Sequence, residues 1–83
     1  MKNLTEMCTL IKSNMNDYNI VHKIIMINTE VIELSILLTS NINSSIITTL
    51  RKKFGHSIIS DHFGIALNKS LYHPAWVILL RVD

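Results

Sequence analysis

The pattern of apolar and polar residues is most informative between positions 20 and 38. An apolar run covers 20–27, is interrupted at Asn28 and Thr29, and resumes over 30–38 with apolar residues at every second position. Alternation is typical of a strand with one face in a core, and a polar pair between two apolar runs is typical of a turn. The pattern therefore predicts a β-hairpin.

The two strands of this hairpin are expected to differ in burial. The first, 20–27, is almost continuously apolar, which predicts burial on both faces or a central position in the sheet. In the second, the even-numbered positions from Ile32 to Leu38 form one apolar face and the other face is mixed. This segment is therefore predicted to be a half-exposed antiparallel strand, and the polar residues 39–43 end it.

A first helix is predicted near the N-terminus, because apolar residues recur there at helical spacing. These residues are Leu4, Met7, Cys8 and Ile11. Asn3 or Thr5 is expected to cap its start. The following residues, 13–19, are rich in Asn, Ser and Asp, whose side chains compete with the backbone for hydrogen bonds. We therefore expect a loop there.

A second helix is predicted to start at Asn43 or Ser44 as its N-cap. Its apolar stripe consists of Ile46, Ile47, Leu50 and Phe54. Arg51, Lys52 and Lys53 fall in its last turn, where they complement the negative end of the helix dipole. Gly55 follows, and we expect it to terminate the helix in a left-handed conformation.

The pattern from 56 to 73 is ambiguous, since it fits either two short helices with a turn at Gly64 or a pair of short strands. Pro74 is expected to end whatever precedes it. The run 76–82 predicts a final strand in the interior of the sheet. The expected fold class is α+β: a small antiparallel sheet, made of the hairpin plus the C-terminal strand, packed against two or three helices.

Composition narrows the class of protein. The chain has 83 residues, 48% of them hydrophobic and 17% charged, so a single domain over 1–83 with one modest core is expected. A net charge of +2 is low for a protein dedicated to binding duplex DNA.

The sole cysteine, Cys8, fits a reducing compartment. Charged residues interrupt 20–38, and the N-terminus lacks the apolar run of a secretory signal, so we expect a soluble, cytoplasmic protein with no membrane partner. The abundance of Ile, Asn and Ser is typical of an AT-rich source such as a phage or mobile element.

No residue pattern points to catalysis, a cofactor or a metal. The four histidines have spacings that match no compact metal motif. Cys8 lies on an apolar stripe, where a thiol behaves as a small hydrophobe. Glu30 and Glu33 fall on opposite faces of the predicted strand, and two glycines cannot form a phosphate-binding loop. We therefore expect a protein that is not an enzyme.

One segment resembles a known family. Within 56–72, Ser60, Phe63, Gly64 and Ile65 hold places that resemble the helix-turn-helix of small phage repressors of the Cro type. The match departs further on, where Ser70 stands at a position that the family fills with an apolar residue. The resemblance implies a DNA-binding regulator. Its base contacts would come from Asn68, Lys69 and Ser70, and its phosphate contacts from Arg51, Lys52 and Lys53.

The main hypothesis is instead a small protein-binding regulator or inhibitor, acting on a partner protein or as a homodimer. Tyr and Trp are enriched where proteins dock, and apolar residues on an exposed strand face indicate a covered surface. The candidate contact residues are Val31, Glu33, Leu37, Tyr72 and Trp76. For Trp76 the competing interpretation is a buried core residue.

Overall fold

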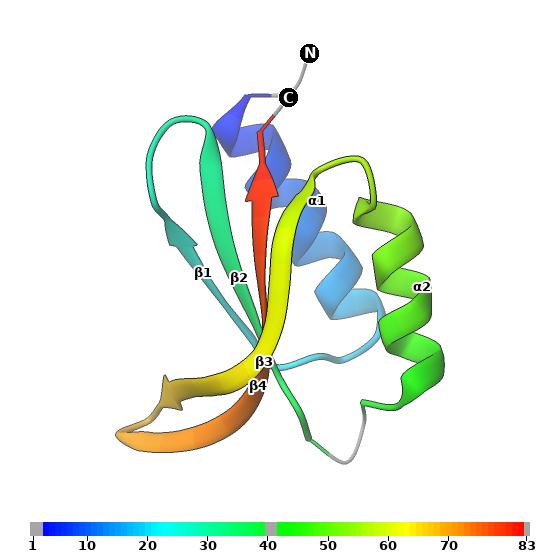
Figure 1. Ribbon diagram of the computed structural model, residues 1–83, viewed down its shortest axis with the longest axis vertical. Helices are drawn as coiled ribbons and strands as arrows, with labels where there is room; N and C mark the ends of the chain where they lie inside the picture. Colours follow the sequence, from blue (N-terminus) through cyan, green and yellow to red (C-terminus); the bar gives the residue numbers. More distant parts are fainter. Residues whose placement is uncertain (1–2, 40–41, 83) are drawn as a thin grey trace.

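The computed structural model describes residues 3–39 and 42–82. Two helices and four strands follow one another along these residues, as Figure 1 shows. They are α1 (Leu4–Asp17), β1 (His22–Met26), β2 (Val31–Leu37), α2 (Ser44–Phe54), β3 (Ile58–Asn68) and β4 (Leu71–Arg81).

The four strands form one antiparallel sheet in the order β1-β2-β4-β3, and both helices lie on the same face of it (Figure 1). Because β4 is antiparallel to both of its neighbours, β2 and β3 run parallel, and α2 crosses over between them. The expected α+β class is confirmed. The sheet has one strand more than expected, and two helices cover it.

The core lies between the helices and the two central strands. β2 and β4 direct alternate side chains toward the helices, because successive residues of a strand point to opposite faces. The fully buried strand residues are Ile32, Leu34, Ile36, Trp76, Ile78 and Leu80, and the helices add Met7, Ile11, Met15, Leu50 and Phe54. Each contributes about 1.5–3 kcal/mol relative to an exposed side chain.

Helix α1 begins as predicted and ends later than predicted. Asn3 is its N-cap and accepts a hydrogen bond from the Glu6 amide at 2.9 Å. The loop expected over 13–19 is wrong up to Asp17, since the helix continues through this polar segment. Met15 lies one turn beyond Ile11 and is completely buried, so tertiary packing outweighs the local preference of Asn and Ser for loops.

The turn at Asn28 and Thr29 is confirmed, but the burial expected for the two hairpin strands is reversed. The apolar strand β1 lies at an edge of the sheet, and Met26 is 60% exposed. β2 is interior rather than half-exposed, because β1 and β4 flank it and Ser35 and Leu37 on its second face are buried.

Helix α2 has the predicted stripe, and Asn43 rather than Ser44 caps it, accepting from the Ile46 amide at 3.0 Å. The left-handed conformation expected for Gly55 is wrong, since this residue has φ −51° and ψ −41° and continues the helical geometry. Of the predicted loop 39–43, Ser40 and Asn41 lie outside the described residues.

The ambiguous region is a β-hairpin, so its two-helix alternative is wrong. β3 contains Gly64 in mid-strand, and the turn consists of Lys69 and Ser70, both with positive φ. Such turns match the twist of the strands they connect. Pro74 does not end an element, because it lies inside β4. Its carbonyl accepts from Leu38 on the β2 side, so the missing N–H leaves the β3–β4 ladder intact. Neither helix in the described parts of the chain is long and apolar enough to cross a membrane.

Candidate functional site

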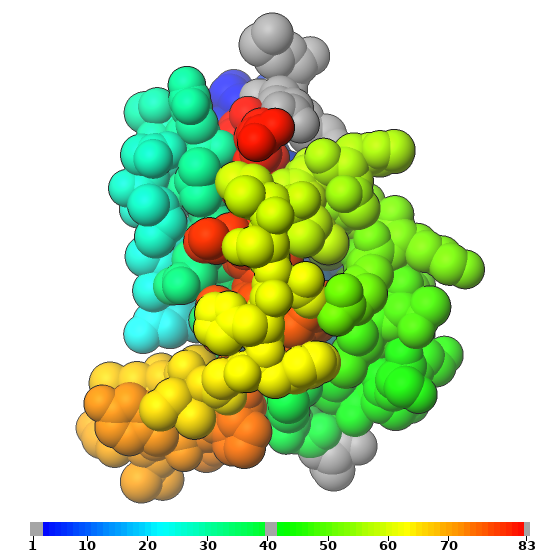
Figure 2. Space-filling model, in the orientation of Figure 1, coloured from blue at the N-terminus to red at the C-terminus, as the bar shows by residue number. Residues whose placement is uncertain are grey.

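The β3–β4 hairpin extends beyond the part of the sheet that the helices cover (Figures 1 and 2). Cross-strand pairing places Phe63 beside Trp76, Ile65 beside Pro74 and Leu67 beside Tyr72. These side chains continue the helix-facing side of the sheet past the end of the helix layer, where no helix covers them. The result is a row of solvent-exposed apolar side chains, here called the hairpin stripe. It consists of Phe63, Ile65, Leu67 and Tyr72, which are 59, 65, 44 and 70% exposed.

The outer edge of β3, the edge that faces away from β4, presents unpaired backbone groups. In β4, Arg81 donates to Ser57 on the β3 side, whereas Val82 donates to Glu30 on the β2 side. Strand residues alternate in this respect, so the odd-numbered residues of β4 bond to β3. Their cross-strand partners are His62, Gly64 and Ala66.

The N–H and C=O groups of the intervening β3 residues, Phe63, Ile65 and Leu67, therefore point away from β4. β3 is the last strand of the sheet order, and no other described segment pairs with this edge. Three residues thus contribute both an exposed apolar side chain and free backbone hydrogen-bonding groups. An apolar edge of this kind is a template for pairing with another chain.

The hairpin is held in place by packing on its other side. Ala66 of β3 and Ala75 of β4 are buried together with Leu37 and Val77 in a second, smaller apolar cluster. The small side chains of Ala66 and Ala75 let the hairpin curl onto the open face of the sheet. The hairpin is therefore a packed element with a defined orientation.

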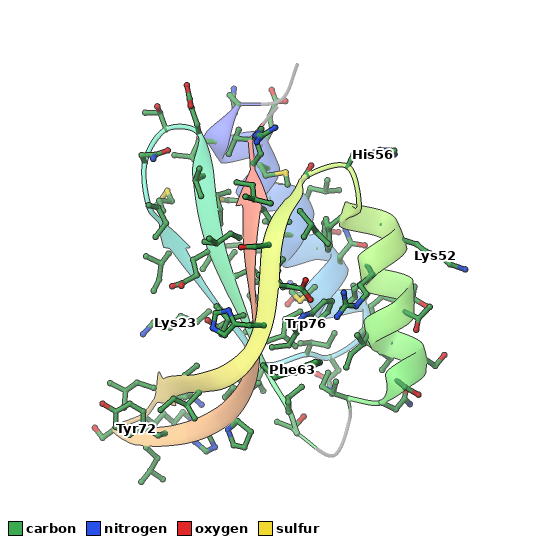
Figure 3. All side chains as sticks on the ribbon, viewed as in Figure 1. Lys23, Lys52, His56, Phe63, Tyr72 and Trp76 are labelled. Atoms are coloured by element: carbon green, nitrogen blue, oxygen red, sulfur yellow. The ribbon has the colours of Figure 1, made fainter. Side chains whose placement is uncertain are left out.

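The base of the hairpin is fixed by Asp61. Its Oδ2 accepts a hydrogen bond from the buried Trp76 indole at 2.7 Å and forms an ion pair with Arg51 of α2 at 2.8 Å. The Arg51 guanidinium also lies 5.0 Å from the Trp76 ring centroid, in cation–π geometry. Phe63 stacks on Trp76 at 6.4 Å between ring centroids; both residues are labelled in Figure 3. The stripe therefore begins at a residue that contacts the core directly.

The structure places the predicted protein-contact residues in environments that range from exposed to fully buried. Tyr72 is exposed at the tip of the hairpin (Figure 3). Val31 and Glu33 are half-buried on the open face of β2. Trp76 is completely buried under α2, which agrees with its competing interpretation as a core residue, and the surface position expected for Leu37 is wrong, since this residue is 3% exposed beneath the hairpin.

The predicted helix-turn-helix is also wrong, because 58–68 and 71–81 are strands. Asn68, Lys69 and Ser70 form the hairpin tip, whereas Arg51, Lys52 and Lys53 lie in the last turn of α2, away from that tip (Figure 1). Arg51 is paired with Asp61, and Lys53 donates to Asn14 at 3.0 Å. Lys52 points into solvent (Figure 3). The structure does not gather these six residues into one basic surface.

The surface of the described residues also has hollows. A groove of about 450 Å³ runs between α1 and β1 and includes Cys8, Lys12 and His22. A smaller hollow of about 240 Å³ under the curled hairpin is lined by Lys23, Glu33 and Ser35 and also by Ile65 and Leu67 of the stripe. Among residues 3–39 and 42–82, no three His, Cys, Asp or Glu side chains come together in a way that could hold a metal ion.

Apart from Tyr72, sequence reasoning missed the hairpin stripe, although a signal for it is present. Phe63, Ile65 and Leu67 alternate with Gly64 and Ala66, which is the period of a strand. A scan against protein-family models and searches of curated proteins and of solved structures found no match to this chain.

Proposed function

We propose that this chain is a small protein-binding module, without catalytic activity of its own, that regulates or inhibits through a protein–protein interface on its β3–β4 hairpin. The observation that carries the proposal is the coincidence of three exposed apolar side chains with three sets of free backbone groups at Phe63, Ile65 and Leu67. Strand addition uses this combination, because main-chain hydrogen bonds give affinity and alternate side chains give specificity.

The surroundings of the stripe support the same function. Asp61 and the cluster around Ala66 orient the hairpin before any partner arrives, which lowers the entropic cost of binding. No Lys, Arg, Asp or Glu lies between His62 and Asn68. Natural edge strands are commonly protected by lysine or proline, and this segment contains neither. We place the module in the cytoplasm, in keeping with its single cysteine, Cys8.

The proposal is tested by site-specific photo-crosslinking in the cells that naturally express the chain. A photoreactive phenylalanine analogue replaces Tyr72 of the stripe, and in a matched control it replaces Thr48, an exposed residue of α2. We expect a discrete crosslinked protein species, either a second copy or another protein, from position 72 and none from position 48. Equal crosslinking from both positions, or crosslinking from position 48 alone, would overturn the proposal.

A further inference from the structure

The outer edge of β3 can pair with the same edge of another copy, and we infer that its binding partner is a second copy of this chain. In this arrangement, β3 of each copy pairs antiparallel with β3 of the other about a two-fold axis, so that the two sheets become one continuous sheet. The inference rests on the proposed function, because it uses the same hairpin, and it names the partner.

The alternation of free backbone groups restricts the register. Only odd-numbered residues of β3 offer N–H and C=O groups outward, so hydrogen-bonded pairs form between odd-numbered residues of the two copies. The register centred on Ile65 places Ile65 opposite Ile65 of the second copy, and Phe63 opposite Leu67 of the second copy. These cross-strand pairs join β-branched, aromatic and aliphatic side chains, which stabilise a sheet.

Charge does not oppose this register. No Lys, Arg, Asp or Glu lies between His62 and Asn68, so no like charges of these residue types meet along the paired segment.

The area available is sufficient for a dimer of modest affinity. Covering the exposed side chains of Phe63, Ile65 and Leu67 together with the strand edge buries roughly 500 Å² per copy, on the order of 1,000 Å² in total, the lower limit for a specific interface. We therefore expect a dissociation constant in the micromolar range. The other free edge is less suited, because β1 has five residues and includes His22 and Lys23.

Sedimentation equilibrium of the full chain, from about 1 to about 500 µM, tests the inference. The wild type is expected to change from monomer to dimer over this range. Ile65→Lys brings two like charges together at the two-fold axis and is expected to raise the dissociation constant at least about tenfold. The matched control Ile65→Val keeps a β-branched apolar side chain and is expected to change it less than about twofold.

A second variant separates pairing from folding. Ile65 faces Pro74 in a pair that exchanges no hydrogen bonds, so its amide donates only outward. Ile65→Pro therefore removes a donor to the second copy and leaves the β3–β4 ladder intact. We expect weakened dimerisation with unchanged circular dichroism and unchanged fluorescence of Trp76.

The outcomes distinguish this inference from the proposed function. If the wild type stays monomeric at the highest concentration while position 72 crosslinks to a different protein, the inference of a second copy is overturned. The proposed protein-binding function is then still supported. Dimerisation that Ile65→Lys and Ile65→Pro do not weaken places the interface elsewhere, for example on β1, and overturns the inference as well. Crosslinking from position 48 alone overturns both.

Discussion

Removing the carboxylate of Asp61 should destabilise the protein more than its partly exposed position suggests. Asp61→Ala leaves the indole N–H of Trp76 without an acceptor, and Trp76 is completely buried. An unsatisfied buried donor costs about 1–3 kcal/mol. The lost ion pair adds at most about 1 kcal/mol, because the Arg51 side chain is 45% exposed. We therefore expect a loss of about 2–3 kcal/mol in the free energy of unfolding.

Two matched variants separate these contributions. Asp61→Asn keeps an oxygen that can accept from Trp76 and loses only the charge, so it should cost about 1 kcal/mol or less. Ser60→Ala changes an exposed neighbour in the same strand and should stay within about 0.5 kcal/mol of the wild type.

Urea unfolding followed by the fluorescence of Trp76, the only tryptophan of the chain, measures all three variants. In thermal unfolding, Asp61→Ala should lower the midpoint by roughly 8–24 °C, given about 4–8 °C per kcal/mol for a domain of this size. The reasoning is refuted if Asp61→Asn costs as much as Asp61→Ala, since the charge and not the acceptor would then matter. It is refuted equally if Asp61→Ala stays within about 0.5 kcal/mol of the wild type.

Three further predictions concern the ends of elements and the core. Asn43→Ala should lower the free energy of unfolding by about 1 kcal/mol and Ser44→Ala by much less, because Asn43 is the cap of α2; equal losses in urea unfolding would contradict this assignment. Replacing the turn pair by Lys69→Asn with Ser70→Gly should stabilise the hairpin by about 0.5–1 kcal/mol, because both residues have positive φ; a lower melting temperature would show that the turn has another conformation. Met15→Ala should lower the free energy of unfolding by about 2–5 kcal/mol, because α1 places Met15 in the core. A loss below about 0.5 kcal/mol would indicate that 13–17 is a loop and not part of α1.

The sequence specifies the α+β class and the first hairpin because both are local patterns. The interruption at Asn28 and Thr29 and the alternation from Ile32 to Ile36 are visible without tertiary information. The N-cap of α2 can be predicted for the same reason, although the sequence alone does not distinguish Asn43 from Ser44. The backbone geometry assigns the cap to Asn43.

Burial and strand order could not be predicted, because they depend on non-local pairing. The apolar character of β1 suggests an interior strand, yet β4 pairs with the other side of β2 and leaves β1 at an edge. The same applies to 13–17, where Met15 keeps a polar segment helical by packing in the core. The segment 56–73 contains both helical and extended periodicities, and its pairing with β4 selects the extended one.

Of the hairpin stripe, only Tyr72 was predicted from the sequence, because the exposure of the other residues depends on tertiary packing. Phe63, Ile65 and Leu67 have the same alternation as the core strands, so the pattern alone places them inside the protein. They are exposed because the helices end before the hairpin does, which no local pattern reveals. Conversely, Trp76 and Leu37 resemble interface residues in the sequence, and packing under α2 and under the hairpin buries them.

The central claim is that the outer edge of β3 pairs with the same edge of a second copy of this chain. Amide hydrogen exchange, resolved by residue and measured at about 1 mM and about 10 µM, tests it most directly. The amides of His62, Gly64 and Ala66 bond to β4 and should be protected at both concentrations. Those of Phe63, Ile65 and Leu67 should exchange rapidly in dilute protein and slowly in concentrated protein. Rapid exchange of these three amides at both concentrations would contradict the claim.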